Sequence, residues 1–373
     1  MVERAKKSEY EKIQRFLESA YGHSYNWFPL SYPQVWRKEN TEFKNTFIIK
    51  EKGEIVSLVR IFPLPLILNG IEVNFAGIGA VATSYSHRGK GYMSVLLQEC
   101  FKEMKKQKLP LSILWGDRHR YKNFGYEVAG KKVFITITSR GLAKNKIESD
   151  KNTKRFQGEK EIFEKIIKAY NQHPYRKKRT KKDFKEIFKS VSSATYYLQK
   201  KNKFAYISIS VETGFRIIEF GGDERLVLQI LKYLEERFGY SSFSLYYPDF
   251  EFIPDLIVST ASSWSVNPEG MIKIIDLFQT LKCFSKKFFL IPENFPITFS
   301  IKNGESVIVE KKSGKVNVWK GKGKNEILLD EIDMVKFLFG TSFWELKGIK
   351  KEITGVLKSV LPINVFMWEF DHI

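Results

Sequence analysis

Hydrophobic and polar residues alternate with two different periods along the first third of the chain. Apolar side chains recur every three or four residues from 8 to 20 and from 93 to 104, which is typical of amphipathic helices. Short runs rich in β-branched and aromatic residues predict strands at 46–49, 55–61, 64–68, 71–75, 75–83, 111–115 and 132–138. Asn69-Gly70 predicts a tight hairpin. An antiparallel meander therefore leads the chain to a strand that ends at Thr83.

The pattern changes at residues 139–160, which are polar, charged and nearly aperiodic, as expected at a domain boundary. Strands, a helix and a strand then follow in the order of the first part, at 196–198, 204–209, 215–220, 225–238 and 242–247. A last unit begins at Met271 with a strand and a helix, followed by strands at 297–301, 305–310, 315–319 and 326–329 and a helix at 332–339. We therefore expect an α+β (mixed αβ) protein with domains at 1–145, 146–270 and 271–373.

Composition supports a folded protein. The 373 residues are 43% hydrophobic and 15% aromatic, which excludes a disordered chain. Cys100 and Cys283 lie in apolar helical patterns, so we expect buried thiols in a reducing compartment. No apolar run follows the charged first residues, and no stretch of 18 uninterrupted apolar residues occurs. The sequence therefore predicts a cytoplasmic protein without a membrane span.

The formal net charge is +20. Lysines are spread along the chain and interspersed with glutamates, which favours solvated charged faces over a nucleic-acid partner. The densest cluster is Arg176-Lys177-Lys178-Arg179-Thr180-Lys181-Lys182. It suits either an RNA, DNA or other anionic partner, or a solvated loop. We favour the loop, because no neighbouring aromatic strands fit an RNA-binding module.

The stretch from Gly79 to Gly130 carries the candidate chemistry. A strand is followed by the turn Arg88-Gly89-Lys90-Gly91-Tyr92-Met93 and then by a helix. Glycines let the backbone approach a ligand closely, and the free N–H groups at a helix start face an anion. The spacing matches neither a Walker loop nor the dinucleotide-binding fingerprint. The turn therefore predicts a phosphate site of another kind.

Two motifs in this stretch resemble the GNAT superfamily of N-acetyltransferases. The first is Arg88-x-x-Gly91-x-Met93, with methionine in place of the usual small residue, and the second is Tyr121-Lys122-Asn123-Phe124-Gly125-Tyr126. The resemblance implies that the turn holds the pyrophosphate of acetyl-CoA and that strand backbone holds the pantetheine arm. The implied cofactor-binding residues are Val81, Ala82, Thr83, Arg88, Gly89, Lys90, Gly91, Tyr92 and Met93. A basic surround would also suit this polyanion.

The order of the three units is similar to the enhanced intracellular survival (Eis) family. That similarity implies a GNAT domain, a second degenerate GNAT-like domain with Gly221-Gly222-Asp223-Glu224 in place of the basic turn, and a sterol-carrier-protein-like tail. It implies Tyr121 as general acid and the terminal carboxylate of Ile373 as general base, although this family usually ends in an aromatic residue. Asp371 or His372 are alternative bases. It also implies a homo-oligomer, a hexamer.

In the superfamily, the loop after the first helix helps to wall the acceptor pocket, so Tyr25, Trp27, Phe28 and Trp36 are candidate substrate-binding residues; core packing explains most of them equally well. We expect an acetyl-CoA-dependent N-acetyltransferase that acts without a metal on a primary amine of the aminoglycoside, polyamine or lysine kind. Transfer would be direct, in a ternary complex. The alternative is a non-catalytic protein that senses acyl-CoA or binds nucleic acid or another anion.

Overall fold

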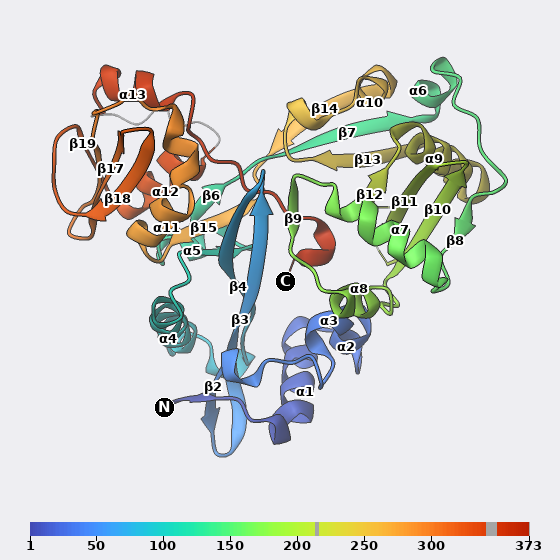
Figure 1. Cartoon of the computed structure of the whole chain (residues 1–373). Helices are drawn as coiled ribbons and strands as arrows, with labels where there is room; N and C mark the ends of the chain where they lie inside the picture. Colours follow the sequence, from blue (N-terminus) through green and yellow to red (C-terminus); the bar gives the residue numbers. More distant parts are fainter. Residues whose placement is uncertain (213–215, 341–348, 373) are drawn as a thin grey trace.

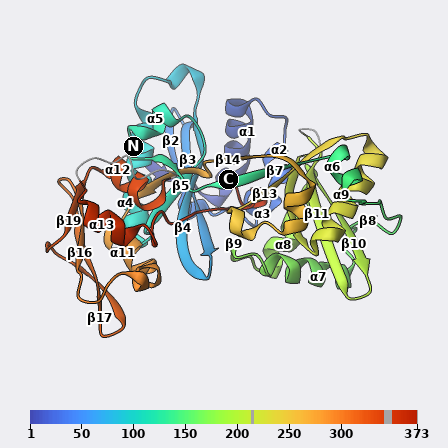
Figure 2. The ribbon, with the colours of Figure 1, turned by 90° about the horizontal axis from the view of Figure 1, so that it is seen from above.

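The computed structural model describes residues 1–212, 216–340 and 349–372. In that part of the chain the strands form four sheets. The long hairpin β3–β4 stands at the centre (Figure 1). From above, the unit built from the last hundred residues lies at one end, the unit built from the middle of the chain at the other, and the N-terminal sheet between them (Figure 2). Short 3₁₀ helices occur at Lys7–Glu9, Phe43–Asn45, Tyr85–His87, Phe250–Phe252, Ser285–Leu290 and Glu369–Asp371.

The central sheet has the strand order β1-β2-β3-β4-β5-β15-β6, with β9 beside β3. Its strands are β1 (Val2–Arg4), β2 (Thr46–Glu51), β3 (Glu54–Leu68), β4 (Ile71–Thr83), β5 (Leu111–Leu114), β6 (Glu127–Ala129), β9 (Tyr175–Lys177) and β15 (Gly270–Ile274). The helices of this region are α1 (Tyr10–Tyr21), α2 (Trp27–Ser31), α3 (Pro33–Trp36), α4 (Tyr92–Lys106) and α5 (Arg118–Lys122). Because side chains alternate along β3, Leu58 packs with α1 and Val59 with α4, on opposite faces.

Strand β3 is longer than the sequence predicts. The expected strands at 55–61 and 64–68 are one continuous strand, although Pro63 and Pro65 lie within it. The carbonyl of Pro65 accepts a hydrogen bond from Lys178, on the side away from β4. Since N–H and C=O of one residue point the same way, both prolines stand where the ladder to β4 needs no N–H. The break at residues 62 and 63 was therefore a wrong prediction.

Strands β4 and β5 separate toward the end of β4. They pair in parallel only from Phe75 to Gly77, so the last residues of β4 have no β5 partner. A bulge lies just beyond, where the register against β3 shifts and Ala80 has a φ of 52°. A bulge bends its strand and increases the local twist. The end of β4 thus exposes backbone N–H and C=O groups toward an open wedge.

The middle unit contains the sheet β12-β11-β10-β8 and the sheet β13-β7-β14. The strands are β7 (Lys132–Thr138), β8 (Lys154–Arg155), β10 (Ser193–Lys200), β11 (Lys203–Ser210), β12 (Ile217–Gly222), β13 (Ser242–Tyr247) and β14 (Ala261–Asn267). The helices are α6 (Ser139–Lys144), α7 (Lys160–Asn171), α8 (Lys181–Ile187), α9 (Glu224–Phe238) and α10 (Asp255–Thr260). Strand β7, expected to complete the first domain, lies instead between β13 and β14.

The last unit is the sheet β18-β17-β16-β19 with helices on one side (Figure 1). It comprises β16 (Ile297–Ile301), β17 (Ser306–Lys312), β18 (Lys315–Lys320), β19 (Glu326–Leu329), α11 (Leu277–Cys283), α12 (Glu331–Phe339) and α13 (Lys351–Leu357). Strand β15, expected to open this unit, is inserted between β5 and β6 of the central sheet. The boundaries expected after 145 and 270 therefore do not follow the borders of the sheets.

The basic run 176–182 is not a solvated loop throughout. Its first residues belong to β9, which pairs with the end of β3. Thr180 caps α8 through a hydrogen bond from the Asp183 N–H. Arg179 is buried, and its guanidinium pairs with Glu219 and Asp371. The run thus joins the central sheet to the middle unit, and the expectation of a loop was wrong at these residues.

Candidate active site

A pocket of about 570 Å³ lies where the end of α1, the end of β4 and the start of α4 meet. It brings together all the predicted cofactor-binding residues except Lys90: Val81, Ala82, Thr83, Arg88, Gly89, Gly91, Tyr92 and Met93. Tyr21 from α1 and Arg120 from α5 complete the lining, together with Ala20 and His87. Residues more than 60 positions apart in the sequence thus converge on one cavity.

The N-terminus of α4 opens into this pocket without a side-chain cap. Gly91 precedes the helix with a φ of 77°, and Gly89 has a φ of 79°. Both values favour glycine, and a Cβ added at either residue would meet no other atom within 4 Å. The first N–H groups of α4 therefore remain available to an anion, and the helix dipole favours negative charge there. These features fit the diphosphate of coenzyme A.

The Glu51 carboxylate holds side chains of the basic turn in place. Its carboxylate accepts a hydrogen bond from the Tyr92 hydroxyl, lies 3.1 Å from His87 Nε2 and pairs with Lys90 Nζ at 3.4 Å. The side chain of Lys90 is thereby drawn away from the pocket lining. Arg88 instead lines the pocket, with its Nε 3.5 Å from the Thr83 carbonyl. Arg88 is therefore the cation of this turn that stands at the cavity.

The open end of β4 is contacted by α1. The Tyr21 hydroxyl donates a hydrogen bond to the Val81 carbonyl at 3.1 Å. This bond places an aromatic ring beside the backbone that β5 leaves unpaired. Tyr21 was not among the predicted site residues, because nothing local distinguishes it from the aromatic residues that follow it.

Tyr121 lies in α5, which follows β5, and is not among the residues that line the pocket, whereas its neighbour Arg120 is. Asp117 caps α5 by accepting a hydrogen bond from the Arg120 N–H at 2.9 Å. The Tyr121 ring is 6% exposed and packs edge-on against Tyr126, with centroids 6.2 Å apart. A Cβ on Gly116 would stand 2.9 Å from this ring, so only glycine fits there. Burial raises the pKa of the Tyr121 phenol, which therefore carries its proton at neutral pH.

The predicted acceptor residues divide into two groups. Tyr25 is 61% exposed, whereas Phe28 and Trp36 are buried in the core between α1 and β3. Trp27 is half-buried and stacks on His23 with ring centroids 3.6 Å apart. Trp36 packs against the guanidinium of Arg60, whose pKa burial lowers to about 9. The placement of Phe28 and Trp36 favours core packing over contact with a substrate.

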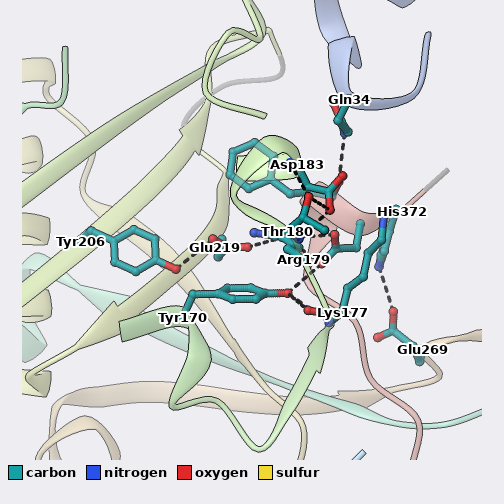
Figure 3. Close-up of polar contacts among 12 residues, drawn as sticks. Gln34, Tyr170, Lys177, Arg179, Thr180, Asp183, Tyr206, Glu219, Glu269 and His372 are labelled. Carbon is teal, nitrogen blue, oxygen red and sulfur yellow. Dashed lines mark hydrogen bonds and ion pairs between the residues drawn. The ribbon is translucent and has the colours of Figure 1, made fainter. Parts of the chain in front are cut away.

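The end of the chain returns to this region. The Phe370 carbonyl accepts a hydrogen bond from Gln34 of α3, and Asp371 pairs with Arg179 through two hydrogen bonds of 2.9 and 2.8 Å (Figure 3). His372 Nε2 lies 2.9 Å from Glu269 Oε1, and its ring stacks on Trp115 with centroids 4.3 Å apart. Ile373, the predicted general base, lies outside the described residues.

Trp115 connects the tail to the wedge. It follows β5 directly, next to the Gly116 that contacts Tyr121, and its indole donates to the Glu269 carbonyl at 2.7 Å. The carboxylate of Glu269 is fully buried. Sequence reasoning missed Trp115 and Glu269 as members of the site. No local signal could have found them, because Glu269 reaches the site only through the pairing of β15 with β5.

Comparison with known proteins identifies a family that part of the chain resembles. Residues 1–129 match the acetyltransferase (GNAT) domain family. Over these residues the chain is similar to a GNAT acetyltransferase domain. The α+β class and the GNAT fold predicted from the sequence are thereby confirmed, as is an N-acetyltransferase, an enzyme class that uses acetyl-CoA or another acyl-CoA. A search of curated proteins finds no match.

Solved structures share the fold of the GNAT domain and of the units that follow it. A conserved Enterococcus faecalis protein described as a probable N-acyltransferase is 19% identical, has a TM-score of 0.72, and the match covers 100% of this chain and 99% of that one. A GCN5-related N-acetyltransferase from Anabaena variabilis is 15% identical and has a TM-score of 0.69, and the match covers 100% of both chains. Eis1 from Mycobacterium abscessus is 11% identical and has a TM-score of 0.61, and the match covers 90% of this chain and 88% of that one.

Two further features concern ligands and membranes. In the described part of the chain, no group of three or more His, Cys, Asp or Glu residues is arranged to hold a metal ion. Among the same residues, no helix is long and apolar enough to cross a membrane.

Proposed function

We propose that the protein transfers the acetyl group of acetyl-CoA to a primary amine by direct attack in a ternary complex. The observation that carries this proposal is the shared pocket of the uncapped α4 N-terminus and the open end of β4. One element suits a diphosphate, and the other offers backbone groups to an extended arm. The alternative, a non-catalytic sensor of acyl-CoA or a binder of nucleic acid or another anion, would use the same pocket without the groups described next.

The chain's own residues would hold the acetyl donor in two places. Arg88, Gly89, Gly91, Tyr92 and Met93 would bind the diphosphate through α4 N–H groups and one guanidinium. The backbone of Val81, Ala82 and Thr83 would pair with the pantetheine amides, as a strand would. Lys90 would add positive charge nearby while it stays paired with Glu51.

Tyr121 would act as the general acid. The departing sulfur is expelled more readily as a thiol than as a thiolate, so a protonated donor beside it accelerates the reaction. Tyr121 keeps its proton because burial raises its pKa. Its hydroxyl makes no hydrogen bond to any described residue, so within this part of the chain it is free to donate to a substrate atom.

A base must take a proton from the acceptor ammonium before the amine can attack. The carboxylate of Ile373 is one proposed base. Of the two alternatives, Asp371 is neutralised by its ion pair with Arg179. His372 fits better, because its Nε2–H can donate to the buried Glu269 and leave Nδ1 as the proton acceptor. We therefore propose the His372–Glu269 pair as the base on the acceptor side.

The remaining proposals follow the family resemblance. The acceptor would be an aminoglycoside-, polyamine- or lysine-like amine, with Tyr25 and Trp27 the accessible members of the predicted wall. The middle unit would be a degenerate GNAT-like domain, because Asp223 accepts hydrogen bonds from the Arg225 and Leu226 N–H groups and so occupies the start of α9. The last unit would be sterol-carrier-like. A cytoplasmic homo-oligomer, a hexamer, remains part of the proposal.

The variant Tyr121→Phe tests the enzymatic proposal. It should lower kcat by about 10² to 10⁴, because it removes only the hydroxyl, while the affinity for coenzyme A, measured by calorimetry, stays within about twofold. A sensor would show the same affinity and no turnover in either protein. Equal turnover by both proteins would remove Tyr121 from the mechanism and leave the class intact.

A further inference from the structure

A second cavity, of about 510 Å³, lies in the middle unit and is formed by different elements from the GNAT pocket. Strand β8, the start of α7, the end of α8 and the start of β10 line it. In Figure 1 these elements lie together in the middle unit, on the side of the molecule away from the last unit. Its volume is in the range of sites that hold small organic ligands. Neither the acetyl donor nor its acceptor needs this cavity.

The charged residues that line this cavity are all basic. Arg155, Lys160, Lys185 and Lys189 line the cavity, whereas no aspartate or glutamate does. This excess is local, since the whole chain has 42 acidic residues against 62 basic ones. Only Lys189 has an ion-pair partner, Glu186; the side chains of the other three make no ion pair with any carboxylate in the described residues. Three cations therefore face the cavity without a counter-charge.

The floor is apolar and aromatic. Phe156, Phe163 and Phe188 line it, and the ring of Phe188 is edge-on to the other two, at 5.1 and 6.2 Å. One rim is anchored to the GNAT domain, because the Ser190 hydroxyl donates to the Ser31 carbonyl at 2.8 Å. An aromatic floor below a ring of cations fits a ligand with a flat ring at one end and several negative charges at the other.

We propose that this cavity is a binding site for a small phosphorylated aromatic ligand of the nucleoside phosphate class. Arg155, Lys160 and Lys185 bind the phosphates, and the three phenylalanines contact the base. A cavity of about 510 Å³ suits one such molecule rather than a polynucleotide, which needs a continuous groove. The neighbouring groove of Lys168 and Lys201 lies beyond α7 and belongs to a separate cavity.

The test uses the full chain and isothermal titration with ATP as the probe, both in free protein and in protein saturated with coenzyme A. We expect one ATP per chain under both conditions, since the GNAT pocket is not involved. Adenosine and pyrophosphate should each bind about tenfold or more weakly, because each satisfies only one half of the site. Loss of ATP binding on saturation with coenzyme A, together with unchanged ATP affinity in the Arg155→Ala/Lys185→Ala variant, would place ATP in the GNAT pocket and overturn the proposal.

A matched pair of double variants locates the site. Arg155→Ala/Lys185→Ala should weaken ATP binding by about tenfold or more, whereas Lys168→Ala/Lys201→Ala, which removes the same charge from the neighbouring groove, should change it less than about twofold. All four side chains are exposed, so both proteins should keep the wild-type melting temperature. Equal weakening by both variants, tighter binding of a single-stranded oligonucleotide than of ATP, or no saturable ATP binding would each contradict the proposal. A failure of coenzyme A binding would instead concern the proposed enzymatic function.

Discussion

Two residues fix the orientation of the His372 ring. Glu269 fixes one ring nitrogen and Trp115 fixes the ring plane. We predict that His372→Gln lowers kcat/KM by about 10²-fold at neutral pH, because the ring nitrogen that would accept the proton of the ammonium is removed. Glu269→Gln should lower kcat/KM less, by about tenfold, since the base survives with a weaker orienting partner.

His119→Gln is the control and should keep the wild-type kcat/KM, because His119 is an exposed residue of α5, next to Arg120. A wild-type kcat/KM for His372→Gln as well would contradict the role of the imidazole.

For His173 the prediction concerns how the stability of the protein depends on pH. It is buried with Nε2 2.8 Å from the Phe220 carbonyl, and burial lowers its pKa to about 4. The unfolded chain binds a proton at this residue below about pH 6.5, whereas the folded chain does so only near pH 4. Its contribution to stability is therefore complete above pH 6.5 and is lost as the pH falls toward 4, by about 3 kcal/mol in total.

Urea unfolding of wild type and His173→Gln at pH 7.5 and 4.5 measures this contribution. The variant should lose less stability between the two pH values than wild type. Identical losses would show that the imidazole is not held neutral in the folded state. Carboxylates that titrate in the same range affect both proteins equally, so the difference isolates His173.

At the scale of elements, the start of α4 depends on left-handed backbone. We predict that Gly91→Ala lowers the free energy of unfolding by about 1 kcal/mol, because alanine is strained at a φ of 77°. It should also weaken coenzyme A binding about tenfold, because the first N–H groups of α4 would no longer point toward the anion. Gly239→Ala is the matched control: Gly239 follows α9 with a φ of 76° and an equally empty surround. It should cost the same stability and leave affinity unchanged. An equal loss of affinity in both would contradict the anion site at α4.

The elements themselves were largely predictable. The hydrophobic periods located β13, β16 and β19 to the residue and α9 and α12 within one residue, because each pattern is local. The wrong predictions concern partners. Strand β15 has an ordinary apolar pattern, and only tertiary packing decides that it pairs with β5 rather than with the unit that follows it. The continuity of β3 likewise depended on which side of the strand its prolines face.

The predictions for the site show the same difference between local signals and distant contacts. The residues predicted in the turn and at the end of β4, apart from Lys90, line one pocket, and they could be proposed because glycines, basic residues and a strand-to-helix change are local signals. Lys90 is held by a distant carboxylate, Glu51, and Trp36 is covered by the core, and neither contact has a local signal. Trp115 and Glu269 meet His372 across more than a hundred residues of sequence, and no spacing rule reaches that far.

For the whole molecule, the buried pair of Arg179 with Glu219 and Asp371 holds the tail against the middle unit (Figure 3). Tyr206 donates to Glu219 and Tyr170 to Asp371, so Glu219 accepts two side-chain hydrogen bonds and Asp371 accepts three. We predict that Arg179→Met destabilises the protein by about 3–5 kcal/mol, because two buried carboxylates lose their partner. It should also release the tail, expose it to carboxypeptidase and lower kcat through the loss of His372.

Lys178→Met, which removes an exposed cation paired only with Glu72, is the control and should leave all three readouts unchanged. A tail that stays resistant to carboxypeptidase in Arg179→Met, at a temperature where the protein is folded, would show that Phe366 to Phe370 hold it by packing alone.

The measurement that tests the central claim most directly is acetyl transfer itself. The protein would be incubated with acetyl-CoA and a panel of aminoglycosides, polyamines and lysyl peptides, with thiol release followed continuously and the acetylated amine identified by mass spectrometry. We predict that at least one amine gains a single acetyl group per thiol released, and that Tyr121→Phe suppresses both signals. Coenzyme A binding without acetylation of any amine would contradict the account and favour a sensor.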